Sequence, residues 1–288
     1  MVEEPIQFYS KNNLLLGILH HSSSNQRTRI GIIVVVGGPQ YRVGSHRQFL
    51  LLARSMARKG IPVFRFDYRG MGDSEGETAS FENIDIDIKS AIDAMFDGCS
   101  NLKKIILWGL CDAASAISFY AYKDPRIHGV VLLNPWIHTE TGQAETYLKH
   151  YYWYRLIDKD FWAKIASGKY NFIKSIRSFT KDVILTVRNR AQHLGIKKKL
   201  LDRENSLPER MLYGLLKFAK PTLIILSEND FTANEFRDNL EKDKAWGKWM
   251  NKTFVRCKNI ADADHTFSSA IWRAEVVEAT YDWLIKLV

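Results

Sequence analysis

The segment WGLCDAAS, which contains Cys111, has the spacing of a catalytic nucleophile held in a tight turn. An apolar strand ends at Trp108, Gly109 follows, and a helix begins at Asp112 with two alanines behind it. Such a strand–turn–helix needs small residues two positions before and after the nucleophile. The helix N-terminus then favours a thiolate and an oxyanion. Cys111 is therefore the candidate nucleophile; the alternative is a small buried hydrophobic residue, which we expect for Cys99 and Cys257.

The later part of the sequence supplies an acid and a base in the order that this nucleophile needs. The strand expected over 222–226 is followed by SEND, which ends in Asp230, and the strand over 252–260 is followed by ADADHTF, which contains His265. Hydrolases with a nucleophile in this turn carry their acid and then their histidine in these places. Glu228 competes with Asp230, and we favour Asp230 because its position suits a loop that reaches across to the histidine.

An oxyanion hole needs two backbone N–H donors. The first would be the N–H of Asp112, directly after the nucleophile. The second would come from GGPQ, which follows the strand expected over 29–36, and because Pro39 has no N–H we choose Gly38. The alternative for these glycines is an ordinary tight turn.

The sequence gives no sign of a metal or an organic cofactor. Its three cysteines have neither zinc-site spacing nor the density of a disulfide framework. The glycines of RFDYRGMGDSEGE (65–77) are too irregular for a dinucleotide fingerprint, so we interpret this stretch as a structural loop near the turn of Cys111.

The elements that would position these residues alternate between short apolar strands and amphipathic helices. This alternation predicts an α/β fold with a mostly parallel central sheet flanked by helices. A hairpin over 6–20 is expected at the edge of the sheet. The expected strands are 29–36, 61–66, 104–108, 130–133, 222–226 and 252–260, and the expected helices are 47–59, 84–95, one from residue 112, and 267–287.

The alternation stops between Asn134 and Lys220, where about 85 residues are too many for one connection. This segment is rich in aromatic residues and helix formers. Residues 151–220 contain 16 Lys and Arg against 6 Asp and Glu, a balance of +10 in a chain of net charge +9. We therefore expect a core of residues 1–134 and 221–288 and a basic, aromatic-rich helical cap, residues 135–220, inserted in it.

Taken together, the motifs resemble the α/β-hydrolase superfamily, in the capped branch of the serine aminopeptidases and monoacylglycerol lipases. GGPQ, DYRGMGDSEG, GLCDAAS, SEND and ADADH follow the order of that family and reach both ends of the chain. More narrowly, GGPQYRVGSHRQF, RFDYRGMGDSEGE and the cysteine are similar to the exosortase A system-associated hydrolases of type 1, which are encoded with bacterial exopolysaccharide and PEP-CTERM sorting loci. The chain departs from the superfamily in having Cys111 where most members have serine, which argues against routine ester hydrolysis, and Ala113 where most have glycine.

These residues predict an acyl hydrolase with a Cys111–His265–Asp230 triad and an acyl-cysteine intermediate. A thiolate beside an imidazolium exchanges readily with thioesters, so an acyl thioester or ester is the expected substrate. The alternatives are an acyltransferase, which would pass the acyl group from Cys111 to an amine or hydroxyl, and a non-catalytic interaction module.

The basic cap and the absence of a membrane-spanning run bear on partners and location. A surface with this charge attracts an acidic acyl carrier protein or an anionic membrane surface, whereas nucleic acid is disfavoured because the charge would cover the substrate entrance. No apolar run approaches about 18 residues, and the first ten residues are acidic, so we expect a cytoplasmic protein that associates at most peripherally with membranes.

Overall fold

The computed structural model describes residues 2–22, 29–38, 40–137 and 206–287. The chain divides into two compact units, one formed by residues 1–138 and 207–288 and the other by residues 139–206. Most of the expected cap lies outside the described residues, so its helical, aromatic and basic character stays a prediction.

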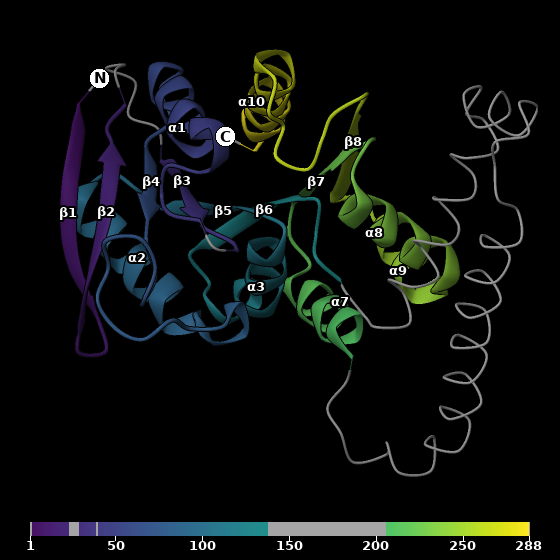
Figure 1. Ribbon diagram of the computed structural model, residues 1–288, viewed down its shortest axis with the longest axis horizontal. Coiled ribbons are helices and arrows are strands. Elements are labelled where there is room, and N and C mark those ends of the chain that lie inside the picture. Colours follow the sequence, from purple (N-terminus) through teal and green to yellow (C-terminus); the bar gives the residue numbers. More distant parts are fainter. Residues whose placement is uncertain (1, 23–28, 39, 138–205, 288) are drawn as a thin grey trace, which may run out of the picture. The chain divides into compact units, whose positions relative to one another are not determined.

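A central sheet of eight strands runs through the larger unit in the order β1-β2-β4-β3-β5-β6-β7-β8 (Figure 1). The hairpin of β1 and β2 lies at one edge and pairs antiparallel with β4, and all later pairs are parallel. The α/β fold and the edge hairpin predicted from the sequence are thereby confirmed. The strands are β1 (Glu3–Ser10), β2 (Asn13–His20), β3 (Ile30–Val35), β4 (Val63–Phe66), β5 (Lys104–Leu110), β6 (Ile127–Leu133), β7 (Thr222–Ser227) and β8 (Val255–Ile260).

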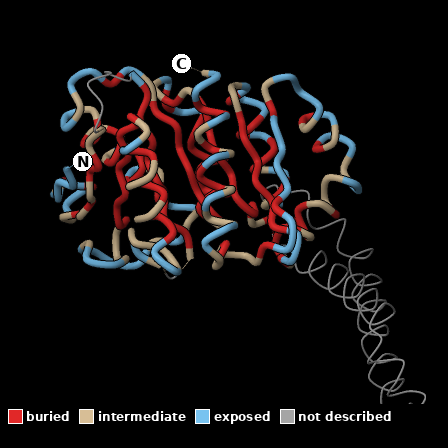
Figure 2. The backbone as a smooth tube through the Cα atoms, turned by 90° about the horizontal axis from the view of Figure 1, so that it is seen from above, coloured by how far each residue is buried: buried red, intermediate tan, exposed pale blue. Residues whose placement is uncertain are grey.

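The middle strands form because apolar residues fill successive positions rather than alternate ones. All six residues of β3 are buried, as are all six of β7. A strand with this pattern is stable where helices cover both faces of the sheet. Figure 2 shows the result, with buried strands in the interior and exposed residues on the outer sides of the helices.

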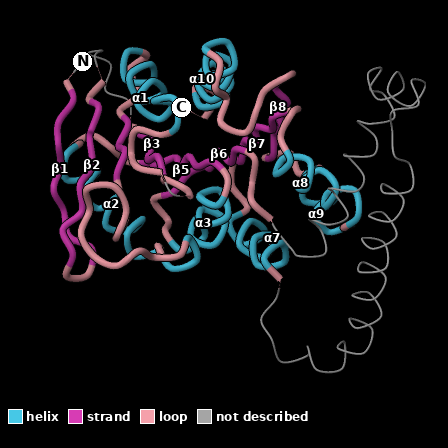
Figure 3. Tube along the Cα trace, in the orientation of Figure 1, coloured by secondary structure: helices cyan, strands magenta, loops and turns pink. Residues whose placement is uncertain are grey.

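Helices cover both faces of the sheet, as Figure 3 shows. α1 and α10 contact each other on one face, and α2, α3 and α7 form a contiguous layer on the other. The helices are α1 (Gln48–Arg58), α2 (Asp85–Gly98), α3 (Asp112–Tyr120), α7 (Leu207–Phe218), α8 (Phe231–Lys242), α9 (Lys244–Met250) and α10 (Ala270–Leu284). Among the described residues, none of these helices combines the length and apolar character that crossing a bilayer requires.

Helix α7 belongs to the sequence segment expected to form the cap, yet it packs against α3 in the larger unit. The two helices approach so closely that a Cβ on Gly214 would overlap the carbonyl oxygen of Ser118. The amphipathic pattern of α7 buries Met211, Leu215 and Phe218 in the core. This helix therefore supports the layer that holds α3 in place.

The outer edge of the sheet is formed by β8, whose four central residues are exposed. Cys257 is one of them, so the expectation that it is buried is wrong. The physical reason is that β8 is the last strand of the sheet and the side chain of Cys257 lines a groove beside α10 instead of packing under a helix. Cys99, after α2, is half-buried and packs against the core.

Candidate active site

The three residues proposed for the triad all follow the carboxyl ends of strands in the parallel part of the sheet. Cys111 comes directly after β5, Asp230 follows β7, and His265 follows β8. Since β5, β6, β7 and β8 are neighbours and run in the same direction, their carboxyl ends meet at one edge of the sheet (Figure 1). Ligand sites of parallel α/β sheets lie at this edge.

The turn between β5 and α3 has the strained geometry of a nucleophile turn. Cys111 has φ 61° and ψ −125°, which is a costly conformation for a residue with a side chain. The neighbours stabilise it, because the Cys111 N–H donates to the carbonyl of Leu133 at 2.9 Å and its carbonyl accepts from the N–H of Trp136 at 3.2 Å. The strand and the helix also approach closely, so a Cβ on Gly109 would press against Ala113 and Ile117.

This close approach predicts the effect of enlarging Gly109. Gly109→Val is expected to lower the free energy of unfolding by about 1–3 kcal/mol, because the added methyl groups overpack the contact between β5 and α3. Urea denaturation followed by circular dichroism would measure the change. As the matched control, Gly247→Ala lies in α9, where an added Cβ has ordinary contacts at 3.6 Å, and should stabilise the protein by roughly 0.5–1 kcal/mol. Equal effects of the two substitutions would contradict the steric explanation.

The structure brings the predicted base and acid into contact. Nδ1 of His265 lies 3.0 Å from Oδ2 of Asp230, in an ion pair whose carboxylate side chain is 6% exposed. The Asp230 carboxylate also accepts from the N–H groups of Thr232 and Ala233, at 3.3 and 3.0 Å, and so caps α8. Glu228, the competing acid, instead accepts from the N–H of Asp262 at 2.9 Å.

His265 interacts with Cys111 as well as with Asp230, and both interactions affect its protonation. Burial by itself lowers the pKa of the imidazole, but the neighbouring Asp230 carboxylate and Cys111 side chain raise the pKa to about 10. At neutral pH the imidazole therefore carries a proton beside the sulfur atom of Cys111. This is the arrangement in which a cysteine serves as a nucleophile and a histidine as its acid and base.

The raised pKa of His265 predicts how stability depends on pH. A histidine has a pKa near 6.5 in the unfolded chain, so protonated His265 stabilises the fold fully below about pH 6.5, and this contribution is lost as the pH rises toward 10. We expect the free energy of unfolding to fall between pH 7 and 10 in the wild type and to fall less in His265→Gln. Urea denaturation at several pH values would measure both; parallel curves would argue against the raised pKa.

A hydrogen-bond network that the sequence did not indicate holds the loop of His265. Asn134, at the end of β6, is fully buried and has φ 40°. Its Nδ2 donates to the carbonyl of His265 at 3.0 Å and to Oγ of Ser227 at 2.8 Å, while its Oδ1 accepts from the N–H of Ser227 at 2.8 Å. Oγ of Ser227 in turn donates to the carbonyl of Asp264 at 2.8 Å. The only available signal was an asparagine directly after an apolar strand, which is also common in turns.

The predicted oxyanion donors lie together, but one of them already has a partner. The Gly38 N–H donates to Oδ2 of Asp112 at 2.9 Å. The other carboxylate oxygen, Oδ1, lies so close to Gly37 that a Cβ there would overlap it. Burial raises the pKa of Asp112, opposed by backbone N–H groups and by the charge of His265. Pro39 lies outside the described residues.

The stretch 65–77 orders the loop that carries Gly38. Asp67 is fully buried and accepts from the backbone N–H of Arg42 at 2.6 Å and from its guanidinium. The same carboxylate accepts from the N–H of Asp73 at 3.2 Å, which lies in the loop after β4. Asp67 thus fixes the loops after β3 and β4 to each other, a structural role like the one expected for this stretch.

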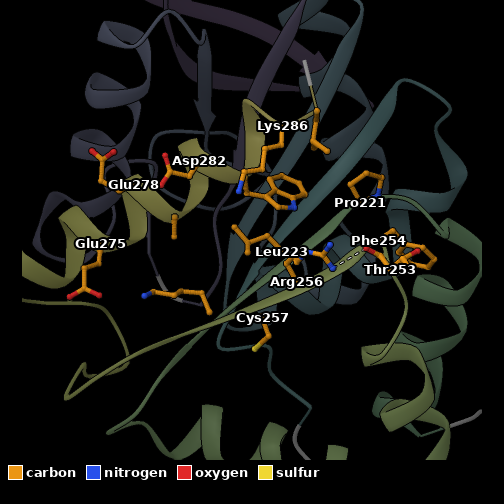
Figure 4. A pocket seen from close by; sticks show the side chains of 14 residues that line it. Pro221, Leu223, Thr253, Phe254, Arg256, Cys257, Glu275, Glu278, Asp282 and Lys286 are labelled. Carbon is orange, nitrogen blue, oxygen red and sulfur yellow. Dashed lines mark hydrogen bonds between the residues drawn. The ribbon is translucent and has the colours of Figure 1, made fainter.

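A groove of about 640 Å³ between β8 and α10 is a separate feature (Figure 4). Its lining includes Pro221 and Leu223 at the start of β7, the exposed Cys257, and acidic residues of α10. Pro221, Thr253 and Phe254, which precede β7 and β8, lie at the opposite end of the strands from Cys111. Within the described ranges, no three His, Cys, Asp or Glu side chains are grouped as metal ligands would be.

Known structures share this arrangement of sheet and helices. The esterase Pf2001 of Pyrococcus furiosus superposes with a TM-score of 0.63 at 16% identity, over 99% of this chain and 90% of the esterase. The α/β-hydrolase GrgF of Penicillium sp. sh18 gives 0.62 at 14% identity, over 99% and 98%. Est1E of Butyrivibrio proteoclasticus, solved with ferulic acid bound, gives 0.62 at 13% identity, over 98% of each chain.

The sheet order, the covering helices and the strained turn define an α/β-hydrolase. A family model supports this class from the sequence side, because residues 29–235 match the model of the serine aminopeptidases S33. The chain belongs to this family and is therefore a hydrolase by class. Comparison with the curated proteins finds no match.

Proposed function

We propose that the protein is an acyl hydrolase that acts through Cys111, His265 and Asp230 on a thioester or ester. The observation that supports this proposal best is that one imidazole interacts with both the Cys111 side chain and the Asp230 carboxylate. In a nucleophile–base–acid triad the histidine lies between the other two residues in this way, and the acid fixes its tautomer and orientation. The strained conformation of Cys111 is the second support.

The reaction would proceed in two acyl transfers. Sγ of Cys111 attacks the acyl carbonyl, the C–S or C–O bond of the substrate breaks, and the leaving group takes the proton held by His265. Water then gives a proton to His265 and attacks the acyl-cysteine, which releases the acid and restores the Cys111 thiolate beside the imidazolium. A thiolate exchanges with thioesters more readily than with alkyl esters, so a thioester is the favoured substrate.

Intact-protein mass spectrometry after mixing with a medium-chain acyl-pantetheine thioester would test this proposal. We expect an acyl adduct in the wild type and none in Cys111→Ala. Cys257→Ser is the matched control, because its thiol is exposed and lies within β8, outside the turn of Cys111. An adduct that persists in Cys111→Ala, or its absence across several chain lengths and an ester series, would overturn the proposal.

The same experiment separates hydrolysis from transfer to another acceptor. If the adduct decays to free acid at the same rate with and without added amines or alcohols, water is the acceptor. If an amine or alcohol accelerates the decay and appears as the acylated product, the protein is an acyltransferase. The resemblance to the exosortase A system-associated hydrolases points to acceptors of bacterial exopolysaccharide metabolism for this test.

The partner proposed for the basic segment 151–220 has its own test. If an acidic acyl carrier protein delivers the acyl group, it should saturate the acylation rate at a lower concentration than the acyl-pantetheine does, because opposite charges increase association. Replacing Lys174, Arg177, Lys181 and Arg188 with glutamine should remove that advantage and leave the pantetheine substrate unaffected. Binding to anionic liposomes instead would identify a membrane surface as the partner.

A further inference from the structure

The carboxylate of Asp112 accepts a hydrogen bond from the backbone N–H of Gly38, the group predicted as the second donor of the oxyanion hole. The Gly38 N–H donates to Oδ2 of Asp112, with 2.9 Å between nitrogen and oxygen. Oxyanion donors act at 2.7–3.1 Å from a negatively charged oxygen. The carboxylate oxygen is thus bound as an oxyanion would be, although it belongs to the residue directly after the nucleophile.

Several features show that this contact is close and specific. Gly37 must lack a side chain for Asp112 to reach this position, because a Cβ there would overlap Oδ1. Oδ1 itself is buried and has no hydrogen-bond partner among the described residues. The positive charge that favours the ionised form of Asp112 is that of the His265 imidazolium. The carboxylate can therefore leave Gly38 without breaking an ion pair with a lysine or arginine of the described part of the chain.

We propose that Asp112 occupies the oxyanion hole of the free protein and competes with the tetrahedral intermediate for the Gly38 N–H. An N–H group has one proton, so the carboxylate and the intermediate cannot both bind it well. Two negatively charged oxygens at neighbouring positions also repel each other. The residue would therefore limit how well the site stabilises the intermediate, and a productive substrate would have to displace its side chain. This inference rests on the proposed function, because it requires an oxyanion to form at Cys111.

The competing explanation is that Asp112 is a positioning residue that ties the loop after β3 to the turn of Cys111. In that case the carboxylate would keep Gly38 in place and the reaction would benefit from it. The two roles predict opposite effects of substitution. Asp112→Ala removes both the charge and the hydrogen bond, whereas Asp112→Asn keeps an oxygen that accepts from Gly38 but removes the charge.

Single-turnover acylation and the binding of a trifluoromethyl ketone would distinguish these roles. The ketone adds to a thiolate to form a hemithioketal whose oxygen is an oxyanion. The affinity of the ketone therefore measures how strongly the oxyanion hole stabilises a negatively charged oxygen. Removing one donor of an oxyanion hole lowers the rate by about 10²–10³-fold. Releasing the Gly38 N–H from Asp112 should therefore raise the acylation rate by a large part of the same factor. We expect Asp112→Ala to acylate about 10–100-fold faster and to bind the ketone more tightly by a similar factor. KM for the thioester should change little.

The matched control is Asp262→Asn, which removes a carboxylate from the exposed loop before His265 and should leave both measurements unchanged. Asp112→Asn is expected to lie between the wild type and Asp112→Ala, and it keeps the test decisive if the alanine variant folds poorly. Slower acylation and weaker ketone binding in Asp112→Ala, with wild-type values in Asp112→Asn, would show the positioning role and overturn the proposal. Equal values in all three proteins would also overturn it.

Failure of the proposed function would look different. If the ketone forms no adduct with Cys111 in the wild type or in either variant, both proposals are wrong. If the adduct forms in the wild type and its affinity does not respond to Asp112, the proposed function stands and the occupied oxyanion hole alone is rejected.

Discussion

His265→Ala is expected to lower the rate of Cys111 acylation by about 10⁴-fold or more, the loss found when the base of a triad is removed. The imidazole is protonated at neutral pH because the Asp230 and Cys111 side chains raise its pKa to about 10. Without it, the thiol has no adjacent base and the leaving group no adjacent acid. Rapid-quench measurement of the acyl adduct under single-turnover conditions would give the rate.

A second histidine provides the control for this substitution. His128, at the start of β6, lies with its Nε2 3.3 Å from Nζ of Lys104, at the opposite end of the strands from Cys111. His128→Ala should therefore acylate within about threefold of the wild type. If His265→Ala retained more than a tenth of the wild-type rate, the imidazole would not be the base, and another group near Cys111 would have to be sought.

The sequence was sufficient to predict the succession of strands and helices along the chain, because burial on both faces of the sheet leaves a clear apolar pattern. In β3 every residue is apolar, and the helix α1 that follows shows an equally clear apolar stripe. The expected bounds were within two residues for both. The turn at Cys111 was also predictable, since only small residues at 109 and 113 allow β5 and α3 to approach so closely.

Other parts of the structure depend on contacts that local patterns do not record. α8 and α9 were not predicted, because their many charged surface residues obscure the apolar positions. α9 is held mainly by Trp246 and Trp249, whose rings pack edge to face with 5.5 Å between their centroids. The role of Asn134 depends on two segments more than 90 residues away in sequence. The sequence also indicated only the backbone N–H of Asp112, whereas the direction of its carboxylate follows from the shape of the loop at Gly38.

Asp230→Asn is expected to lower the acylation rate by about 10³–10⁴-fold while leaving the fold intact. The loss follows because asparagine cannot hold a charged imidazole, and it presents either an oxygen or an amide to Nδ1 of His265. The cap of α8 should be retained because asparagine caps helices as well as aspartate does, so the loss of stability should be limited to the contribution of protonated His265. The pKa of His265, measured by NMR, should fall from its raised value at the same time.

Glu228→Gln is the matched control, and it tests the choice between the two acids of SEND. Glu228 accepts from the N–H of Asp262 at 2.9 Å, and glutamine can accept the same hydrogen bond, so we expect a rate within about threefold of the wild type. If Glu228→Gln lost as much activity as Asp230→Asn, the acid would not be Asp230 alone, and the loop between β8 and α10 would have to rearrange during the reaction. A loss confined to Asp230→Asn, with the helix cap and the fold intact, would mean that the carboxylate acts through the histidine.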